Sequence, residues 1–307
     1  MQTTKFKKIL VPTDFSKVAD FAIDKACMLA THFNSDLYVL HTIEANPYKT
    51  VFPENYKEDV ILQQYVMDRM GNLAKEISNK YGINVTTLIG ESKPIEVIEG
   101  AVKDNKIDLI VMGTHGAGGI REYLVGSNAQ KVVHGSVCPV LTIKKDNGKQ
   151  EFANIIMPIK NWTNTLEKVD YVIELASAFG SKVHLLEVED SKKPEAIKKI
   201  NELSSTAEKQ LQDAKINYEK ISIKSSHEAR ETLEYAKKVN ADLIVIMTER
   251  ESHLTEPVLY LFARQVLNHS DIPVMNIKPA MYHAEHIKFH QDPVHRGDHR
   301  TDPVSIG

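Results

Sequence analysis

The chain carries the same pattern of strands and turns twice, and this internal repeat restricts the possible folds more than any other feature. Residues 6–12 are matched by residues 152–158, and residues 107–112 are matched by residues 241–246. Self-similarity over such a distance indicates two copies of one folding unit, and 307 residues are enough for about two domains. We therefore predict one domain at residues 1–146 and a second at 151–279, followed by a polar tail at 280–307.

Apolar runs alternate with segments of helical spacing within each copy. In the first copy, Ala19, Ala22, Ile23 and Ala26 recur at intervals typical of a helix. Continuous apolar strands separated by helices favour an α/β fold whose parallel sheet is covered on both faces. The predicted strands of the first copy lie at residues 6–11, 37–43, 83–89, 107–112 and 137–143. Residues 44–59 are expected to form a long loop, either covering a site or as a plain insertion, before a helix at 65–80.

Composition excludes several classes of function. The formal net charge is −3, so no basic surface argues for nucleic acid. No apolar run approaches the roughly 18 residues that a membrane helix needs, and the first residues lack an apolar signal region. We therefore expect a cytoplasmic protein. Its two cysteines, Cys27 and Cys138, are expected to be reduced core residues.

A glycine-rich turn follows the fourth predicted strand. Gly113 and Gly116 are separated by two residues, and nine further residues lead to Gly126 and Ser127, where a helix is expected to begin. Glycine lets the backbone approach a ligand closely, Ser127 is suited to an N-cap, and a helix start favours an anion. The spacing predicts a phosphate site that is neither a P-loop nor a dinucleotide fingerprint. A flexible surface loop is the alternative.

This glycine pattern, the strand before it and the closing run Cys138-Pro139-Val140-Leu141-Thr142-Ile143 resemble the ATP-binding signature of the universal stress protein family. The chain start at residues 8–16 resembles that family's opening as well. The resemblance implies two tandem doubly wound domains, flavodoxin-like or Rossmann-like, each with a parallel five-stranded sheet in the order 3-2-1-4-5. It also implies a pseudo-twofold pairing of the two halves. Because residues 140–143 and 274–277 are the last strands of their sheets, we predict that these edges meet antiparallel.

The resemblance also implies which residues bind the nucleotide. It places Asp14 near adenine and ribose, the backbone of Thr42 beside the adenine, and Met112 with Gly113 beside the ribose. Backbone N–H groups at the glycine-rich turn would hold the phosphates, with a divalent cation, Mg²⁺ or Mn²⁺, bridging the phosphate oxygens. The complete predicted ATP site comprises Pro12, Thr13, Asp14, Thr42, Met112, Gly113, His115, Gly116, Gly126, Ser127 and Asn128. His115 is weighed as a catalytic base, but no neighbouring carboxylate orients it, so no catalytic residue is assigned.

The second copy differs from the first at these positions. Met247 stands at the position of Gly113, Arg250 at that of Gly116, and Lys160 at that of Asp14. Tyr260 and Leu261 replace Gly126 and Ser127. Because large side chains would fill the space that phosphates need, we interpret the second half as a degenerate partner. An alternative is that Lys160 and Arg250 bind a different anion.

The predicted function is that of an ATP-binding stress-response protein acting by nucleotide-dependent conformational change or partner binding. A slow ATPase or phosphotransferase is one alternative, and a nucleotide-free interaction module binding a metabolite or metal is another. The partners expected are an adenine nucleotide, an unidentified protein and a second copy of the chain. In the tail, His283, His286 and His290 would share one helical face, but a solvated or packed tail is favoured over a zinc site, and no metal ligand is assigned.

Overall fold

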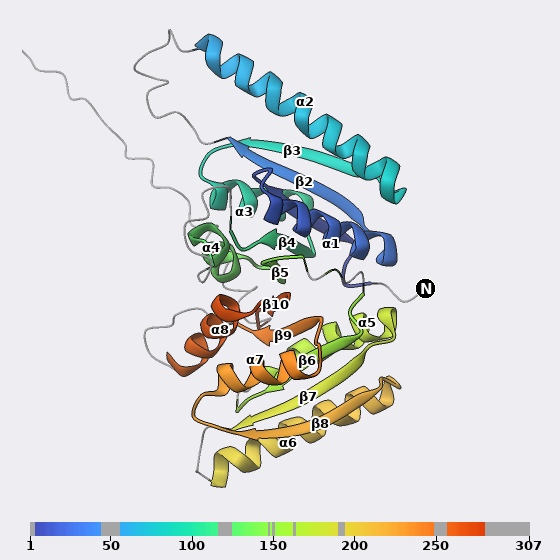
Figure 1. Ribbon diagram of the computed structural model, residues 1–307, viewed down its shortest axis with the longest axis vertical. Helices are drawn as coiled ribbons and strands as arrows, with labels where there is room; N and C mark the ends of the chain where they lie inside the picture. The colour runs from blue at the N-terminus through green and yellow to red at the C-terminus, as the bar shows by residue number, and fades with distance from the viewer. Residues whose placement is uncertain are drawn as a thin grey trace, which may run out of the picture.

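The computed structural model describes residues 4–43, 56–115, 125–146, 148, 151–161, 164–189, 194–248 and 257–279, with the side chains of 56–59 and 257–260 excepted. Figure 1 shows two α/β halves stacked along the long axis of the molecule, the N-terminal half above the C-terminal one. The predicted site residue Gly116, its counterpart Arg250 and the histidine-rich tail lie outside the described residues.

The first half alternates strands and helices along its whole length. Its strands are β1 (Lys8–Thr13), β2 (Asp36–Ile43), β3 (Val85–Glu91), β4 (Leu109–Gly113) and β5 (Val140–Ile143). Its helices are α1 (Lys17–Phe33), α2 (Tyr56–Tyr81), α3 (Pro94–Asn105) and α4 (Ser127–Gly135). Local chemistry sets several of these ends: the Ser16 side chain accepts from the Ala19 N–H at the start of α1, and Pro94 begins α3.

The second half repeats this order. Its strands are β6 (Asn154–Ile159), β7 (Lys182–Glu189), β8 (Tyr218–Lys224), β9 (Leu243–Met247) and β10 (Val274–Ile277). Its helices are α5 (Val169–Phe179), α6 (Pro194–Asp213), α7 (Glu228–Lys238) and α8 (Pro257–His269), with a short 3₁₀ turn at Thr165–Lys168 before α5. The internal repeat of the sequence is thus a repeat of structure.

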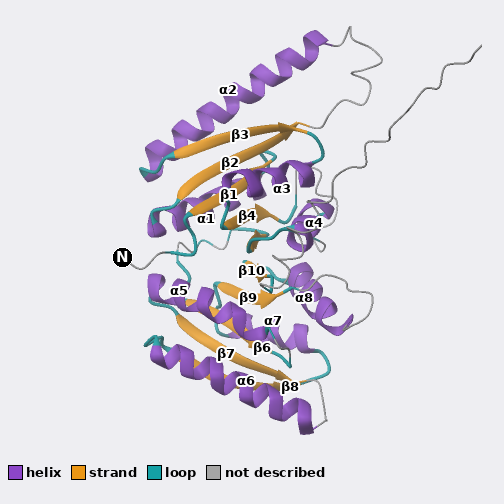
Figure 2. Ribbon diagram, turned by 180° about the vertical axis from the view of Figure 1, so that it is seen from behind, coloured by secondary structure: helices purple, strands orange, loops and turns teal. Residues whose placement is uncertain are grey.

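All strands form one ten-stranded sheet in the order β3-β2-β1-β4-β5-β10-β9-β6-β7-β8. Pairing is parallel within each half, and β1 lies between β2 and β4 as β6 lies between β7 and β9. Helices cover both faces of the sheet in each half, as Figure 2 shows. The predicted α/β fold class, with two doubly wound halves, is confirmed.

The two halves join through their last strands. β5 and β10 pair antiparallel, with Leu141 opposite Met275 and Thr142 opposite Val274. All four residues of each strand are buried. The predicted antiparallel meeting of these edges is confirmed, and its physical reason is that an apolar sheet edge left unpaired would expose backbone groups and apolar side chains to water.

Two predictions about local structure are wrong. The helix expected from residue 65 begins at Tyr56, because Val60, Ile61 and Leu62 extend it and no proline lies between Pro53 and the end of the helix at Tyr81. The start of α4 is capped by Gly126 and not by Ser127, which is the first helical residue. Within the described residues, no helix is long and apolar enough to cross a membrane.

Both cysteines are buried free thiols, as predicted. Burial, together with the neighbouring Asp24 carboxylate, raises the pKa of the Cys27 thiol to about 12. Burial likewise raises the pKa of Cys138 to about 11. Since the thiolate is the reactive form, both side chains behave as small apolar core residues.

Candidate functional site

The candidate site lies at the carboxyl ends of β1 and β4, where the strand order of the first half reverses. In doubly wound sheets this switch point is the usual place for a ligand. Ile9 and Leu10 of β1 pair with Leu109 and Ile110 of β4, so the loops that follow the two strands emerge side by side. One loop leads from β1 into α1, and the other leads from β4 toward α4.

The loop after β1 presents Asp14 to solvent. Thr13 is buried, and its hydroxyl accepts a 3.0 Å hydrogen bond from the Phe15 N–H. One carboxylate oxygen of Asp14 accepts from the Ser16 N–H at 3.0 Å, while Ser16 caps α1. Asp14 therefore orders the loop, and the helix cap is Ser16. Pro12 precedes these residues inside β1 and is half-buried.

An aromatic cluster that the sequence analysis missed stands beside Asp14. Phe15 adopts a positive φ of 59°, which is uncommon for a bulky residue. Its ring lies 4.6 Å from the His41 ring, and the Arg69 guanidinium of α2 lies 4.0 Å from the Phe15 ring centre. The imidazole Nδ1 of His41 contacts the Thr13 carbonyl oxygen at 2.8 Å. The positive φ turns Phe15 toward α2, and no sequence pattern indicates that contact.

A cavity of about 440 Å³ opens next to this cluster between α1 and α2. It is lined by Phe15, Asp20, Tyr65, Asp68, Arg69, Asn72, Leu73 and Glu76. Thr42, the residue expected beside the adenine, is half-buried on β2 and pairs with Gly90 of β3. Asp14 directly follows β1 and Thr42 is the next-to-last residue of β2, and these two strands are parallel neighbours.

At the end of β4, Met112 is buried and Gly113 allows a close approach by α1. A Cβ on Gly113 would lie 3.0 Å from Val18 Cγ1 and 3.3 Å from the Val18 carbonyl carbon. Glycine is therefore needed here for packing. This contact brings the start of α1 to the switch point between β1 and β4.

Backbone hydrogen bonds then join the end of β4 to the start of α4. The Thr114 N–H donates to the Ile143 carbonyl at 2.8 Å, and the Gly126 N–H donates to the Thr114 carbonyl at 2.6 Å. The Gly126 N–H was expected to bind phosphate, but in the structure it is hydrogen-bonded to the Thr114 carbonyl oxygen. The N–H groups of Ser127 and Asn128 belong to the open first turn of α4, and both residues are exposed. This helix start suits an anion.

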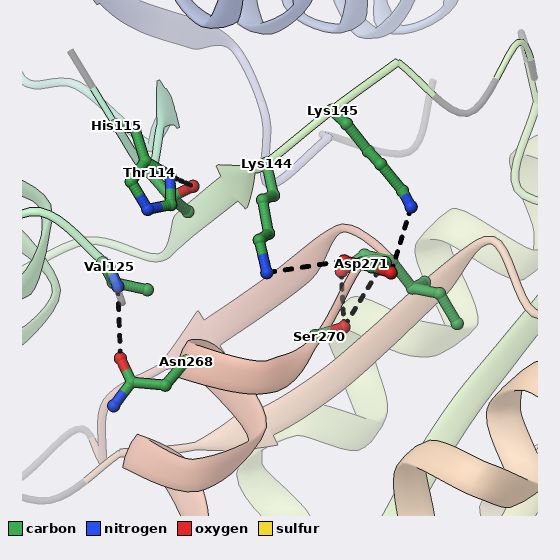
Figure 3. Close-up of polar contacts among 9 residues, drawn as sticks. Thr114, His115, Val125, Lys144, Lys145, Asn268, Ser270 and Asp271 are labelled. Carbon is green, nitrogen blue, oxygen red and sulfur yellow. Dashed lines mark hydrogen bonds and ion pairs between the residues drawn. The ribbon is translucent and has the colours of Figure 1, made fainter. Parts of the chain in front are cut away.

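His115 turns its ring toward the Thr114 hydroxyl, with Nδ1 2.8 Å from Oγ1. The other ring nitrogen, Nε2, is buried and has no hydrogen-bond partner within the described part of the chain. A buried imidazole nitrogen without a partner is costly, so a ligand oxygen or water at this position would relieve it. Figure 3 shows His115 and Thr114 beside the end of β5.

The second half reaches across the interface to this loop, which the sequence analysis did not foresee. The Asn268 side chain of α8 accepts a 3.3 Å hydrogen bond from the Val125 N–H. Asp271 pairs with Lys144 at 3.4 Å and with Lys145 at 3.0 Å, just after β5 (Figure 3). Burial opposes ionisation of Asp271, but hydrogen bonding and attraction by the two lysines outweigh it and lower the pKa of Asp271.

The equivalent place in the second half is built differently. Met247 stands at the position of Gly113 and is buried. Tyr260 and Leu261 lie inside α8, one turn after it begins at Pro257, so no helix start is offered there. Lys160, at the position of Asp14, is buried, pairs with Glu228 and lies 4.5 Å from the Phe262 ring centre. Because Glu228 already balances the Lys160 charge, the alternative of an anion bound by Lys160 loses support.

A second buried lysine lies next to Lys160. Lys168, which ends the 3₁₀ turn before α5, is 1% exposed and donates to the Thr165 hydroxyl at 3.1 Å. Burial, together with repulsion by Lys160, lowers the pKa of Lys168 to about 7. Two buried lysines therefore lie in the part of the second half that corresponds to the Asp14 loop of the first.

A metal site made wholly of protein ligands is not found in this part of the molecule. Among the described residues, no group of three or more His, Cys, Asp or Glu side chains lies close enough to hold an ion.

Comparison with known proteins places both halves in one family. The model of the universal stress protein family matches residues 5–144 and again residues 151–278. Universal stress protein MJ0531 of Methanocaldococcus jannaschii is 33% identical over 143 residues, covering 46% of this chain and 83% of that protein. Universal stress protein MJ0577 of the same organism is 30% identical over 158 residues, covering 46% of this chain and 97% of that protein.

Solved structures agree in fold. A universal stress protein from Archaeoglobus fulgidus has a TM-score of 0.69 at 18% identity, covering 89% of this chain and 96% of that one. A putative universal stress protein from Pseudomonas aeruginosa has a TM-score of 0.68 at 15% identity, covering 94% and 98%. A universal stress protein solved in complex with cAMP is 22% identical with a TM-score of 0.33, covering 46% of this chain and 98% of that one.

Proposed function

Because the chain belongs to the universal stress protein family, whose model matches both of its halves, we propose that it binds ATP in its first half. The nucleotide would alter the conformation of the protein or its binding to a partner, and so serve a stress response. The bound ATP would carry Mg²⁺ or Mn²⁺ between its phosphate oxygens. Asp14 and Thr42 would meet the ribose and adenine, and the start of α4 would meet the phosphates.

One observation carries this proposal: the two halves share a fold but differ at the switch point. In the first half, Gly126 ends the loop and α4 opens with the exposed residues Ser127 and Asn128. In the second half, α8 begins one turn earlier and buried Met247 replaces a glycine. An open helix start next to a glycine at the switch point is an arrangement suited to a nucleotide phosphate.

The Phe15 cluster supports the same assignment at the other end of the site. Strained backbone at a bulky residue persists where the surrounding structure demands it, and such residues gather at functional sites. Here the strained residue directly follows Asp14. A flat aromatic and cationic surface beside Asp14, formed by Phe15 and Arg69, is suited to a nucleobase.

Partner binding is supported by the outer surface of α2. Val60, Ile61, Leu62, Tyr65 and Met67 are exposed there, at 45 to 70% of their full accessibility. Among the described residues, the corresponding helix α6 exposes no large apolar side chain. Apolar side chains that are exposed together along one stretch of a helix mark an interaction surface. A second copy of the chain would supply it, and sedimentation of the wild type against Ile61→Lys tests this: a dimer lost in the variant supports the assignment, and two identical monomers refute it.

Mass spectrometry of the nucleotide carried by purified, gently denatured protein tests the main proposal. ATP or ADP released in near-stoichiometric amount would support it. A chain that carries no nucleotide and also fails to bind millimolar ATP would instead be the nucleotide-free interaction module.

A further inference from the structure

The cross-interface ion pair at Asp271 lies next to the proposed phosphate site. Lys144 directly follows Ile143, whose carbonyl oxygen accepts from the Thr114 N–H at 2.8 Å. Thr114 in turn accepts from the Gly126 N–H at 2.6 Å. A path of two hydrogen bonds therefore leads from the start of α4 to the residue before Lys144.

The two lysines that share Asp271 occupy different positions. In Figure 3 the Lys144 side chain lies between His115 and Asp271, whereas Lys145 approaches Asp271 from the far side. The Lys144 side chain is 17% exposed and lies 3.4 Å from the carboxylate, whereas that of Lys145 is 55% exposed at 3.0 Å. An ammonium group that is mostly withdrawn from water is a stronger partner for an anion than an exposed one.

The ion pair is specific to the half that keeps the glycines. Lys278, which directly follows β10, corresponds to Lys144. Its ammonium donates to the His134 carbonyl oxygen. Val137 stands in the first half where Asp271 stands in the second. A strict pseudo-twofold relation would place the same ion pair on both sides of the interface. Val137 supplies no carboxylate for such a pair in the first half.

We propose that Lys144 is a phosphate-binding residue of the ATP site, held by Asp271 of the second half until the terminal phosphates of ATP take its place. This inference rests on the proposed ATP binding and adds to it a specificity-determining residue and a regulatory contact. Binding of ATP moves the Lys144 ammonium toward the phosphates and leaves Asp271 paired with Lys145 alone. The second half, whose described residues offer no open helix start at the equivalent position, thereby registers whether a triphosphate is present.

Calorimetric titration of the full chain with ATP and with AMP, both with Mg²⁺, tests the inference. Lys144→Met is expected to weaken ATP binding about tenfold and AMP binding less than twofold, because AMP lacks the terminal phosphates. Lys145→Met is the matched control, since it removes a lysine from the same carboxylate and should leave both affinities within twofold. Equal losses for ATP and AMP, or an equal effect of Lys145→Met, would overturn the inference.

Asp271→Asn gives a result that a purely structural ion pair would not give. It removes the competitor for Lys144 and a negative charge near the phosphates, so ATP affinity should rise about threefold while thermal stability falls slightly. A lower ATP affinity in this variant overturns the inference. If the wild-type chain binds AMP and ATP with equal affinity, the inference about Lys144 is wrong and the proposed nucleotide binding stands. If the wild type binds neither nucleotide, the proposed function itself fails, and the inference with it.

Discussion

The Gly126 N–H donates to the Thr114 carbonyl oxygen over 2.6 Å, and this hydrogen bond joins the end of β4 to the start of α4. A Cβ on Gly126 would lie 3.0 Å from the same oxygen. Any side chain at this position must therefore push the two segments apart, because neither contact involves a flexible group. The glycine is a requirement of the loop whether or not a ligand is bound.

Gly126→Val is expected to weaken ATP binding at least tenfold, about 1.4 kcal/mol. The added side chain separates the start of α4 from Thr114 and disturbs the proposed phosphate site. Calorimetry measures the affinity. The control is Gly100→Val in α3, where nothing lies within 4 Å of an added Cβ. Equal affinities for the two variants would show that the phosphates bind elsewhere.

A stoichiometry of one ATP per chain is expected. The second half offers no open helix start at the equivalent position, and buried Met247 stands in place of Gly113. Titration calorimetry gives the number of sites directly, and loss of all binding in Gly126→Val would assign the site to the first half. A second site of similar affinity would contradict the interpretation of the second half as degenerate.

Lys168→Met should stabilise the protein, and more so below neutral pH. In the folded chain the pKa of Lys168 is lowered from 10.5 to about 7, so the unfolded chain binds an extra proton between these values. Lys168 therefore costs the wild type stability progressively as pH falls from about 10.5 to about 7, and its cost is constant below that. In urea unfolding at pH 6, the free energy of unfolding of Lys168→Met should exceed that of the wild type by on the order of 3 kcal/mol. The difference should be smaller at pH 9.5.

Thr165→Val is the control for that series, because it removes the hydroxyl that accepts from Lys168 and keeps the ammonium. Thr165→Val should be less stable than the wild type, whereas Lys168→Met should be more stable. A pH-independent difference between the wild type and Lys168→Met would mean that Lys168 is not perturbed in the folded chain.

Glu228→Gln is expected to destabilise the protein by about 3 kcal/mol, since it removes the carboxylate that neutralises the buried Lys160 ammonium. Lys160 and Glu228 have side chains only 6% and 10% exposed. The double variant Lys160→Met with Glu228→Leu should recover much of that loss, because apolar residues of similar size often replace a buried pair without cost. Denaturant unfolding of both variants measures the difference, and additive losses would contradict a coupled pair. ATP affinity should not change in either variant.

The repeat and its apolar runs were sufficient to predict the α/β fold class, and the strand order implied by the family resemblance led to the predicted antiparallel meeting of β5 and β10. Both follow from local rules: apolar strands separated by helices need cover on both faces, and an apolar edge needs a partner. The glycine spacing likewise predicted a site at the loop between β4 and α4, because the backbone freedom of glycine is a local property. The ends of elements were harder, since α2 begins at Tyr56 and α4 is capped by Gly126, and capping depends on a balance of about 1 kcal/mol.

The sequence by itself determined the two-domain α/β architecture and the difference between its halves, because periodicity and glycine spacing act over a few residues. The tertiary structure alone decided which distant groups meet. Arg69 reaches Phe15 from α2, Asn268 reaches Val125 from the other half, and Asp271 holds Lys144 across the interface. These residues are separated by dozens of positions in the chain and carry no local signal. Their contacts arise from the packing of α2 on α1 and from the pairing of β5 with β10.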